Sequence, residues 1–296
     1  MTILKVENIS KKYGVIQALK GVSFSVNKGS VFGILGPNGS GKTTLLGIIM
    51  NVLKPSGGGF QLFGEAAKDS HRKKIGTLLE TPNFYHYLNA VQNLKITCAI
   101  KGIGEEDIEH VLHVVDLWKR KDSRFSTYSL GMKQRLAIGA ALLGNPEVLV
   151  FDEPTNGLDP VGISEIRNLI KDLSAKGKTI IMASHLLDEV DKVCTDVAIL
   201  KKGTLLTSGS VADLFKQTDI VQLSCAENEA IINAFKNLSN HTKIEMVEGL
   251  VEISYNTGQI NLATINKFCF DNGITLSHLQ LKKGNLESKF LELTSN

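Results

Sequence analysis

The sequence predicts an α/β protein whose main domain contains a parallel sheet and is followed by a small α+β domain. A glycine-rich turn near residue 40 lies between an apolar strand pattern and a helix pattern, the order of a strand–loop–helix unit. The runs Val148–Phe151 and Thr179–Ser184 are largely apolar without alternation, as expected of strands buried on both faces of a parallel sheet. With 296 residues, the chain is long enough to bury a full core without disulfides or metals.

The N-terminal part predicts strands on either side of one helix. Short apolar runs separated by turns indicate the strands, and apolar residues at helical spacing after the glycine-rich turn indicate the helix. The proline and glycines of Lys54–Gly59 mark a loop before a further short strand. The strands are expected at residues 3–9, 22–26, 31–36 and 60–64, and the helix at 43–53.

Helical patterns dominate from about residue 85 to 143, so we interpret this segment as a helical subdomain inserted into the α/β core. Strand patterns then return, with a helix between two of them that forms a further strand–helix–strand unit. A final helix pattern closes this domain, for which we predict the bounds 1–218. The helices are expected at 88–102, 105–118, 131–144, 163–177 and 211–217, and the strands at 148–154, 179–185 and 197–209.

Residues 219–296 predict a second, smaller domain. The patterns follow the order strand–helix–strand–strand–helix–strand, which is typical of a ferredoxin-like α+β fold. A last short helix is expected at residues 286–293, and no internal repeat is present. The strands are expected at 219–225, 244–255 and 274–282, and the helices at 227–238 and 261–273.

Charge and cysteine content argue against a nucleic-acid binder, a zinc protein and a disulfide-rich protein. The 33 basic and 30 acidic side chains give a net charge of +3, which does not favour a nucleic-acid partner. The four cysteines fit no zinc pattern and no disulfide framework, so we expect free thiols. No signal peptide is evident, and the longest nearly apolar run, Leu136–Gly144, is far shorter than the roughly 18–20 residues of a membrane span. Any association with a membrane is therefore expected to require a partner.

The segment from Gly36 to Thr43 matches GxxxxGK[ST], the phosphate-binding P-loop, and lies between the expected strand and helix. Only glycines allow a chain to wrap a phosphate so tightly, and the helix N-terminus adds a favourable dipole. Lys42 would supply a charge for the β- and γ-phosphates, and Thr43 a hydroxyl for Mg²⁺. The expected nucleotide contacts are Gly36, Pro37, Asn38, Gly39, Ser40, Gly41, Lys42, Thr43 and Thr44.

Downstream, the apolar run at 148–151 ends in Asp152 and Glu153. Carboxylates at the end of a buried strand are unfavourable unless they meet a cation. Asp152 is suited to hold Mg²⁺ through its water shell, and Glu153 to orient or deprotonate the attacking water. The alternative is an ordinary exposed strand end.

Further motifs carry a resemblance to the ATP-binding subunits of ABC transporters. Residues 128–134, YSLGMKQ, resemble the signature of that family, and PTNGLDP at 154–160 resembles its D-loop. Ser184 and His185 after a strand resemble the H-switch, and Tyr13 precedes the first core strand as the A-loop aromatic does. The resemblance covers residues 1 to about 218, and it implies a P-loop NTPase core with ATP and Mg²⁺ as cofactors.

The resemblance also implies roles for these residues and a homodimer or pseudo-dimer that sandwiches two ATP molecules. Tyr13 would stack on adenine, although a packed surface tyrosine is the alternative. His185 would contact the γ-phosphate, unless it is only structural. Ser129 and Gly131, at a helix N-terminus, would face the γ-phosphate bound to the opposite subunit, unless Ser129 is only a cap. Asp159 of the D-loop would also lie at the nucleotide.

Two departures from the family pattern narrow the resemblance. Glu80 stands where the family usually has the Q-loop glutamine, and the signature has Leu130 and Met132 in place of glycine and glutamine. These variants look like those of exporters for bacitracin-type and lantibiotic peptides. Glu80 would offer an oxygen to Mg²⁺ or to the attacking water, and thus a catalytic role. If the alignment is shifted by one residue, it is only an acidic loop residue.

The expected function is therefore ATP hydrolysis coupled to export of a peptide antibiotic or drug-like substrate through a separate polytopic membrane permease. We expect a cytoplasmic protein, peripheral to the inner face of the cell membrane. One alternative, an ABC-type ATPase acting on nucleic acid, is disfavoured by the single P-loop and the short interval before the signature. The other alternative is a regulatory or non-transport ATPase, for which residues 219–296 leave room; in the simplest interpretation they only stabilise the dimer or pack on the main domain.

Overall fold

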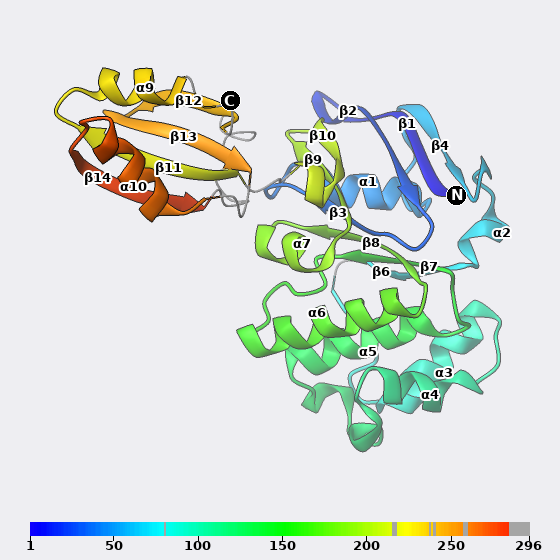
Figure 1. Ribbon diagram of the computed structural model, residues 1–296. Coiled ribbons are helices and arrows are strands. Elements are labelled where there is room, and N and C mark those ends of the chain that lie inside the picture. Colours follow the sequence, from blue (N-terminus) through cyan, green and yellow to red (C-terminus); the bar gives the residue numbers. More distant parts are fainter. Residues whose placement is uncertain (80, 215–217, 237, 239–240, 257–259, 284–296) are drawn as a thin grey trace. The chain divides into compact units, whose positions relative to one another are not determined.

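The computed structural model describes residues 1–296 except 80, 215–217, 237, 239–240, 257–259 and 284–296. The chain divides into two compact units, Met1–Val211 and Ala212–Asn296 (Figure 1). The sequence patterns placed this division at residue 218, after the helix α8 (Val211–Leu214), whereas the contacts place it at the start of that helix. The expected position of Glu80 and the expected helix at 286–293 lie outside the described residues.

A six-stranded sheet forms the centre of the first unit. Its order is β10-β9-β3-β8-β7-β6, and all neighbours are parallel except the hairpin of β9 and β10. Every residue of β3, β7 and β8 is buried, which confirms the interpretation of their unbroken apolar runs. The strands are β3 (Val31–Leu35), β6 (Ile75–Leu78), β7 (Val148–Asp152), β8 (Thr179–Ser184), β9 (Asp196–Lys201) and β10 (Thr204–Ser210).

A four-stranded antiparallel sheet covers the helix that follows β3. Its order is β2-β1-β4-β5, with β1 (Thr2–Tyr13), β2 (Ile16–Asn27), β4 (Gly57–Leu62) and β5 (Glu65–Ala66). Helix α1 (Lys42–Ile49) shares one apolar core with residues of both sheets. The expected loop over the glycines of this region is wrong, because Gly57 already pairs with Ser10 of β1. A side chain at Gly58 would lie 2.1 Å from the Asn8 carbonyl oxygen, so glycine here permits close strand pairing.

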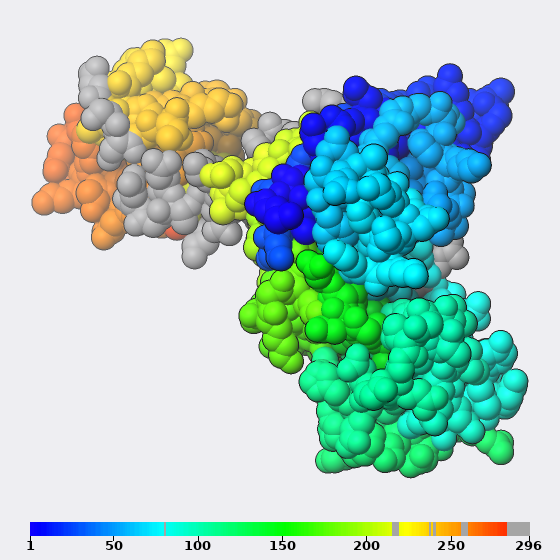
Figure 2. All heavy atoms as spheres, turned by 90° about the vertical axis from the view of Figure 1, so that its right-hand side faces the viewer, coloured from blue at the N-terminus to red at the C-terminus, as the bar shows by residue number. Residues whose placement is uncertain are grey.

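Three helices between β6 and β7 form the expected helical subdomain, α3 (Ala90–Lys101), α4 (Asp107–Val114) and α5 (Leu130–Leu142), with short 3₁₀ turns at Trp118–Arg120 and Phe125–Thr127. Figure 2 shows this subdomain, in cyan to green, projecting from the rest of the unit. Asn89 and Gln92 form a capping box that starts α3. Helix α4 ends earlier than the apolar pattern predicted, because Asp116 adopts a positive φ of 52° that breaks the helix.

The remaining helices of the unit are α2 (Asp69–Arg72), α6 (Pro160–Ala175) and α7 (Leu187–Val193). Of these, only α6 was expected from the sequence. Pro160 occupies the first turn of α6, where its missing N–H is not needed. Among the residues that the structure describes, no helix has both the length and the apolar character of a membrane span.

The second unit has the strand and helix order that its sequence predicted. A four-stranded antiparallel sheet of order β12-β13-β11-β14 carries helices α9 (Asn228–Lys236) and α10 (Leu262–Asp271). Alternate residues of the central strands, such as Val221 and Ile253, form one core with Ile231 and Phe235 of α9. The strands are β11 (Thr218–Cys225), β12 (Lys243–Val247), β13 (Leu250–Asn256) and β14 (Leu276–Lys283).

Candidate functional site

Three loops meet at the carboxyl edge of the parallel sheet, where ligands bind in open α/β folds. The glycine-rich turn follows β3, Asp152 ends β7 and Glu153 follows it, and His185 follows β8. The register sets them side by side, because Leu35 pairs with Ser184 and Asp152 pairs with Ala183. Two backbone hydrogen bonds join the loops: the Gly36 N–H donates to the Ser184 oxygen at 3.3 Å, and the Glu153 N–H donates to the Ala183 oxygen at 3.1 Å.

The glycine-rich turn has the conformation that the P-loop motif predicts. Gly39 and Gly41 have φ values of 77° and 106°, which L side chains rarely adopt. At Gly36, a Cβ atom would lie 2.3 Å from the Leu200 carbonyl oxygen, so this glycine permits close packing against β9. Pro37, Asn38 and Gly39 are exposed at the tip of the turn.

The start of α1 is suited to an anion. Gly41 is its N-cap, and among the described residues no side chain caps the free N–H groups of the first turn. The Ser40 hydroxyl is buried and has no hydrogen-bond partner in the same described part of the chain. Thr43 is exposed and Thr44 half-buried in the first turn. These groups fit a phosphate chain that accepts hydrogen bonds from the turn, with the Thr43 hydroxyl available to a magnesium ion.

Lys42 connects the glycine-rich turn with the carboxylate of Glu153. Its side chain is only 5% exposed, and its amino group donates to the carbonyl oxygens of Gly36 at 2.8 Å and Pro37 at 3.3 Å. The same amino group lies 3.2 Å from Glu153 Oε1. A phosphate that binds Lys42 therefore competes with the Glu153 carboxylate for this cation.

Glu153 occupies a strained turn directly after β7. Its φ is 50°, an unfavourable value for a residue other than glycine. In this conformation the backbone leaves the direction of β7 at Glu153, and the Glu153 side chain remains 19% exposed. His185 Nδ1 lies 2.7 Å from Glu153 Oε2. Lys42, Glu153 and His185 thus form one continuous polar chain.

Asp152 precedes Glu153, which belongs to this polar chain of side chains, and it is 3% exposed at the last position of β7.

A second buried acid, Glu189 of α7, was missed by the sequence analysis. Its Oε2 accepts a hydrogen bond of 2.8 Å from the Ser184 hydroxyl, whose oxygen accepts the Leu186 N–H at 3.0 Å. This pair holds both ends of the loop that carries His185. The only sequence signal is a glutamate five residues after the strand-end serine.

The residues of the signature and of the D-loop contact each other within the chain. Ser129 caps α5 by accepting the Met132 N–H at 3.3 Å, and Asp159 caps α6 through the Gly162 N–H at 2.9 Å. The Leu130 side chain, 45% exposed, packs so close to Gly157 that a Cβ there would lie 3.1 Å from Leu130 Cδ2. The leucine that replaces the usual signature glycine therefore lies against the D-loop.

Two more details complete the signature region. The Tyr128 hydroxyl donates to the Arg120 carbonyl oxygen at 2.7 Å, and burial raises the pKa of this phenol. Gly131 follows Leu130 in the first turn of α5 and is half-buried. The Tyr128 hydrogen bond fixes the segment just before α5, where Ser129 remains exposed.

Tyr13 ends β1 and is 45% exposed, with Lys11 Nζ 5.0 Å from the ring centroid. Its partner across the hairpin is Ile16, also exposed at 66%. Together they present an aromatic face and an aliphatic one, which suits stacking of a planar base. Ile16 was not among the residues that the sequence analysis singled out. Glu80 lies outside the described residues, so its catalytic and magnesium-binding roles stay predictions.

Comparison with known proteins agrees with this geometry. Residues 19–156 match the ABC transporter family. The bacitracin transport ATP-binding protein BcrA of Enterococcus faecalis is 34% identical, over 98% of this chain and 96% of BcrA. The lantibiotic transport ATP-binding protein SrtF of Streptococcus pyogenes is 35% identical, over 69% of this chain and 89% of SrtF. The dimeric ATP-binding cassette MJ0796, solved in a post-hydrolysis state with ADP and Pi, is 28% identical with a TM-score of 0.63, over 71% of this chain and 99% of the cassette.

The resemblance to bacitracin and lantibiotic transport subunits, indicated by the departures at Glu80, Leu130 and Met132, is confirmed by BcrA and SrtF. The P-loop NTPase core expected from the glycine-rich turn is confirmed as well. The chain therefore belongs to the ABC transporter family, as one of its ATP-binding ATPase subunits.

Proposed function

We propose that this chain hydrolyses ATP to export a peptide antibiotic or drug-like compound through a separate polytopic permease. The observation that carries the proposal is the match to BcrA over nearly the whole of both chains, at 98% and 96%. This match includes the second unit, which the match to SrtF, covering 69% of this chain, does not span in full. The proposed location, at the inner face of the cell membrane, follows from docking on that permease.

The site supports a hydrolytic mechanism in which the P-loop binds the phosphates. We propose that Lys42 contacts the β- and γ-phosphates, and that this contact releases the Glu153 carboxylate from its ion pair. The freed carboxylate orients the attacking water and accepts its proton. His185 holds the same carboxylate in place through its Nδ1 and faces the γ-phosphate.

Thr43 and Asp152 would hold Mg²⁺, with Glu80 as a further proposed oxygen donor. When bound, the ion supplies positive charge to the phosphate oxygens. The role proposed for Asp152 is supported by its position at the end of β7, at the same edge of the sheet as the P-loop turn that follows β3, with β8 between the two strands. Removal of the Asp152 carboxylate should therefore affect hydrolysis more than the packing of the sheet.

We propose that two copies pair around two nucleotides, because Ser129 and Leu130 of the signature face solvent within one chain. Ser129 is exposed and Gly131 half-exposed at the N-terminal end of α5, where the helix dipole favours an anion. The related cassette MJ0796 is dimeric. Asp159 of one copy would lie at the shared interface, and Tyr13 would stack on the adenine of its own copy.

The proposed roles of these residues also suggest how the chain divides into domains. We propose residues 1–218 as the ATP-binding domain, with the helical subdomain at about 85–143, and residues 219–296 as an accessory domain. All P-loop, signature and D-loop residues lie in the first compact unit. The accessory domain has its own core around Phe235 and Val251, so it is built as a separate folding unit.

The test is capture of this chain from detergent-solubilised membranes, followed by identification of what binds it. A polytopic membrane protein should copurify, and ATPase activity should rise on reconstitution with it. The Lys42→Ala variant is the matched control, since it should still bind the permease but lose ATP binding and hydrolysis. Recovery of nucleic acid or of no membrane protein would contradict the transport role, while wild-type ATP affinity in the variant would contradict the P-loop role.

A further inference from the structure

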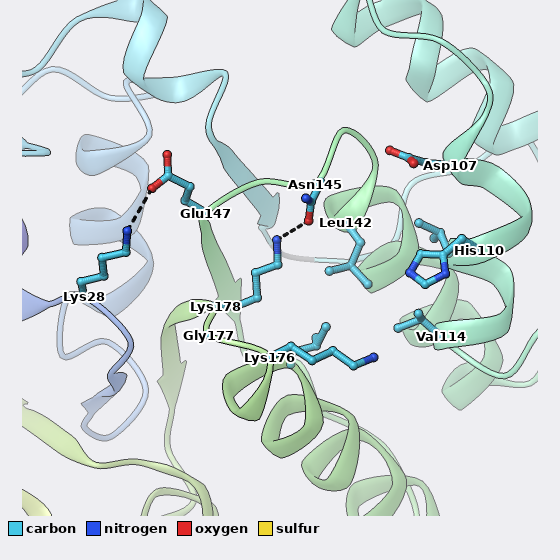
Figure 3. A pocket seen from close by; sticks show the side chains of 12 residues that line it. Lys28, Asp107, His110, Val114, Leu142, Asn145, Glu147, Lys176, Gly177 and Lys178 are labelled. Carbon is cyan, nitrogen blue, oxygen red and sulfur yellow. Dashed lines mark hydrogen bonds and ion pairs between the residues drawn. The ribbon is translucent and has the colours of Figure 1, made fainter.

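A cavity lies at the N-terminal ends of the parallel strands, opposite to the ends that carry the P-loop. Its volume is about 480 Å³, within the roughly 300–1,000 Å³ typical of small-molecule sites. Residues that precede β7 and β8 line one side, and helix α4 of the helical subdomain lines the other (Figure 3). We call it the basic cavity, after the lysines described below. All of it belongs to the first unit.

The floor of the basic cavity is apolar. Val111 and Val114 of α4 face it from the helical subdomain, and Leu142 of α5 and Leu173 of α6 complete it. Val111 and Leu173 are each 3% exposed, so their side chains are already packed and give the floor a fixed shape. Such a floor accepts a hydrocarbon body better than a fully polar ligand.

The rim of the basic cavity has more cationic than anionic groups. Three lysines and two acidic residues line it. Glu147 is shared by two lysines, with its carboxylate 3.7 Å from Lys28 and 3.8 Å from Lys74. Lys178 donates to the Asn145 amide oxygen at 2.5 Å and to the Pro146 carbonyl at 2.6 Å, so its acceptors are neutral. Burial lowers the pKa of Lys178, and the nearby Glu147 carboxylate opposes this shift only in part.

Lys176 is the cation best placed to meet a ligand. It follows the last residue of α6, and Figure 3 shows its side chain extending toward Val114 and His110 of α4. No residue in the described part of the chain accepts a hydrogen bond from its ammonium group. Asp107, the second acid of the rim, is exposed on α4. A lysine at a helix C-terminus also offsets the helix dipole, but that role requires no apolar hollow beside it.

We propose that the basic cavity binds a small amphipathic anion, with its carboxylate on Lys176 and its hydrocarbon body on the apolar floor. The ammonium gives a charge-assisted hydrogen bond, and the floor supplies burial of the chain. The occupant would contact α4 and α6 at once and thus connect the helical subdomain with the α/β core. This site is separate from the ATP site, which lies at the other ends of the same strands.

The test is calorimetric titration of the full chain with octanoate, octanol and octylammonium, which share a hydrocarbon body and differ in charge. Octanoate should bind, and both other probes should bind at least about tenfold more weakly, because neither octanol nor octylammonium can form an ion pair with the Lys176 ammonium. The Lys176→Glu variant should lose octanoate affinity by about tenfold or more for the same reason.

The matched control is Lys171→Glu, which makes the same charge change on an exposed residue of α6 that does not line the cavity. It should bind octanoate like the unchanged protein, and melting temperatures should show that both variants fold. Val114→Trp, which fills the hollow, should also abolish binding. Octanol binding as tightly as octanoate, equal effects of the two lysine variants, or absence of octanoate binding would each overturn the proposal.

Discussion

Replacing Glu153 with glutamine separates the chemical role of this side chain from its structural one. The amide keeps the shape of the carboxylate, and its oxygen can still accept from Lys42 while its nitrogen faces His185. What the substitution removes is the negative charge and the ability to accept a proton. Because a general base contributes about 10²–10⁴ in rate, the kcat for ATP should fall by that factor.

The same substitution should strengthen ATP binding. Under the proposed mechanism, the phosphates in the unchanged protein displace a carboxylate that lies 3.2 Å from the Lys42 amino group, and the Lys42 side chain is 5% exposed and thus little screened by solvent. The carboxylate forms an ion pair with the Lys42 ammonium and the amide only a charge–dipole hydrogen bond, and hydrogen bonds that involve a charged group range over about 1.5–3 kcal/mol. The difference, about 1–1.5 kcal/mol, corresponds to a Kd for ATP that is about tenfold lower.

Phosphate release measures the first effect, and calorimetric titration with magnesium-ATP measures the second. Glu147→Gln is the matched control, because Glu147 pairs only with surface lysines in the described structure and lies away from the P-loop. It should change neither quantity. Wild-type turnover in Glu153→Gln would refute the assignment of the base, and weaker ATP binding would refute competition for Lys42.

Three further results are expected. Tyr13→Ala should raise the Kd for ATP about tenfold while Tyr13→Phe leaves it unchanged, because base stacking contributes about 1–3 kcal/mol and needs only the aromatic ring. Fluorescence titrations with ATP measure both Kd values, and an equal change in the two variants would contradict stacking. Leu130→Ala, which removes the contact with Gly157, should lower kcat several-fold at an unchanged melting temperature, and full activity would show that the contact is incidental. Burial raises the pKa of Tyr255 from 10.0 to about 12, so the neutral phenol is favoured in the folded second unit. That stability is complete below pH 10.0 and is lost as pH rises through about 12, so circular dichroism should show alkaline unfolding that Tyr255→Phe moves to higher pH; an identical profile in both proteins would refute it.

The motifs in the sequence indicated the loops that the structure brings together at the carboxyl edge of the parallel sheet. Strands with unbroken apolar runs are parallel and buried, and parallel strands end at one edge of a sheet. The P-loop motif, the strand-end carboxylates and the resemblance to ABC ATPases assigned Lys42, Glu153 and His185 to one ATP molecule, and the common edge of these strands is consistent with that assignment. The structure joins these three through contacts of 3.2 and 2.7 Å.

Other features could not be predicted because they depend on contacts between distant segments. Gly57 forms part of a strand only because β1 lies against it, although its local composition indicates a loop. The short strand β6 carries four residues, too few for a reliable pattern. The buried pair of Ser184 and Glu189 depends on where α7 packs, and the contact of Leu130 with Gly157 depends on the approach of two loops.

The backbone at Glu153 has a consequence for anyone who wishes to stabilise this protein. A φ of 50° is comfortable for glycine or asparagine and unfavourable for glutamate, by about 1–3 kcal/mol. A selection that rewards heat resistance alone would therefore favour variants that relax this bend and discard the carboxylate. Under the role proposed for Glu153, such variants would gain thermal stability and lose ATPase activity, so engineering must measure both quantities.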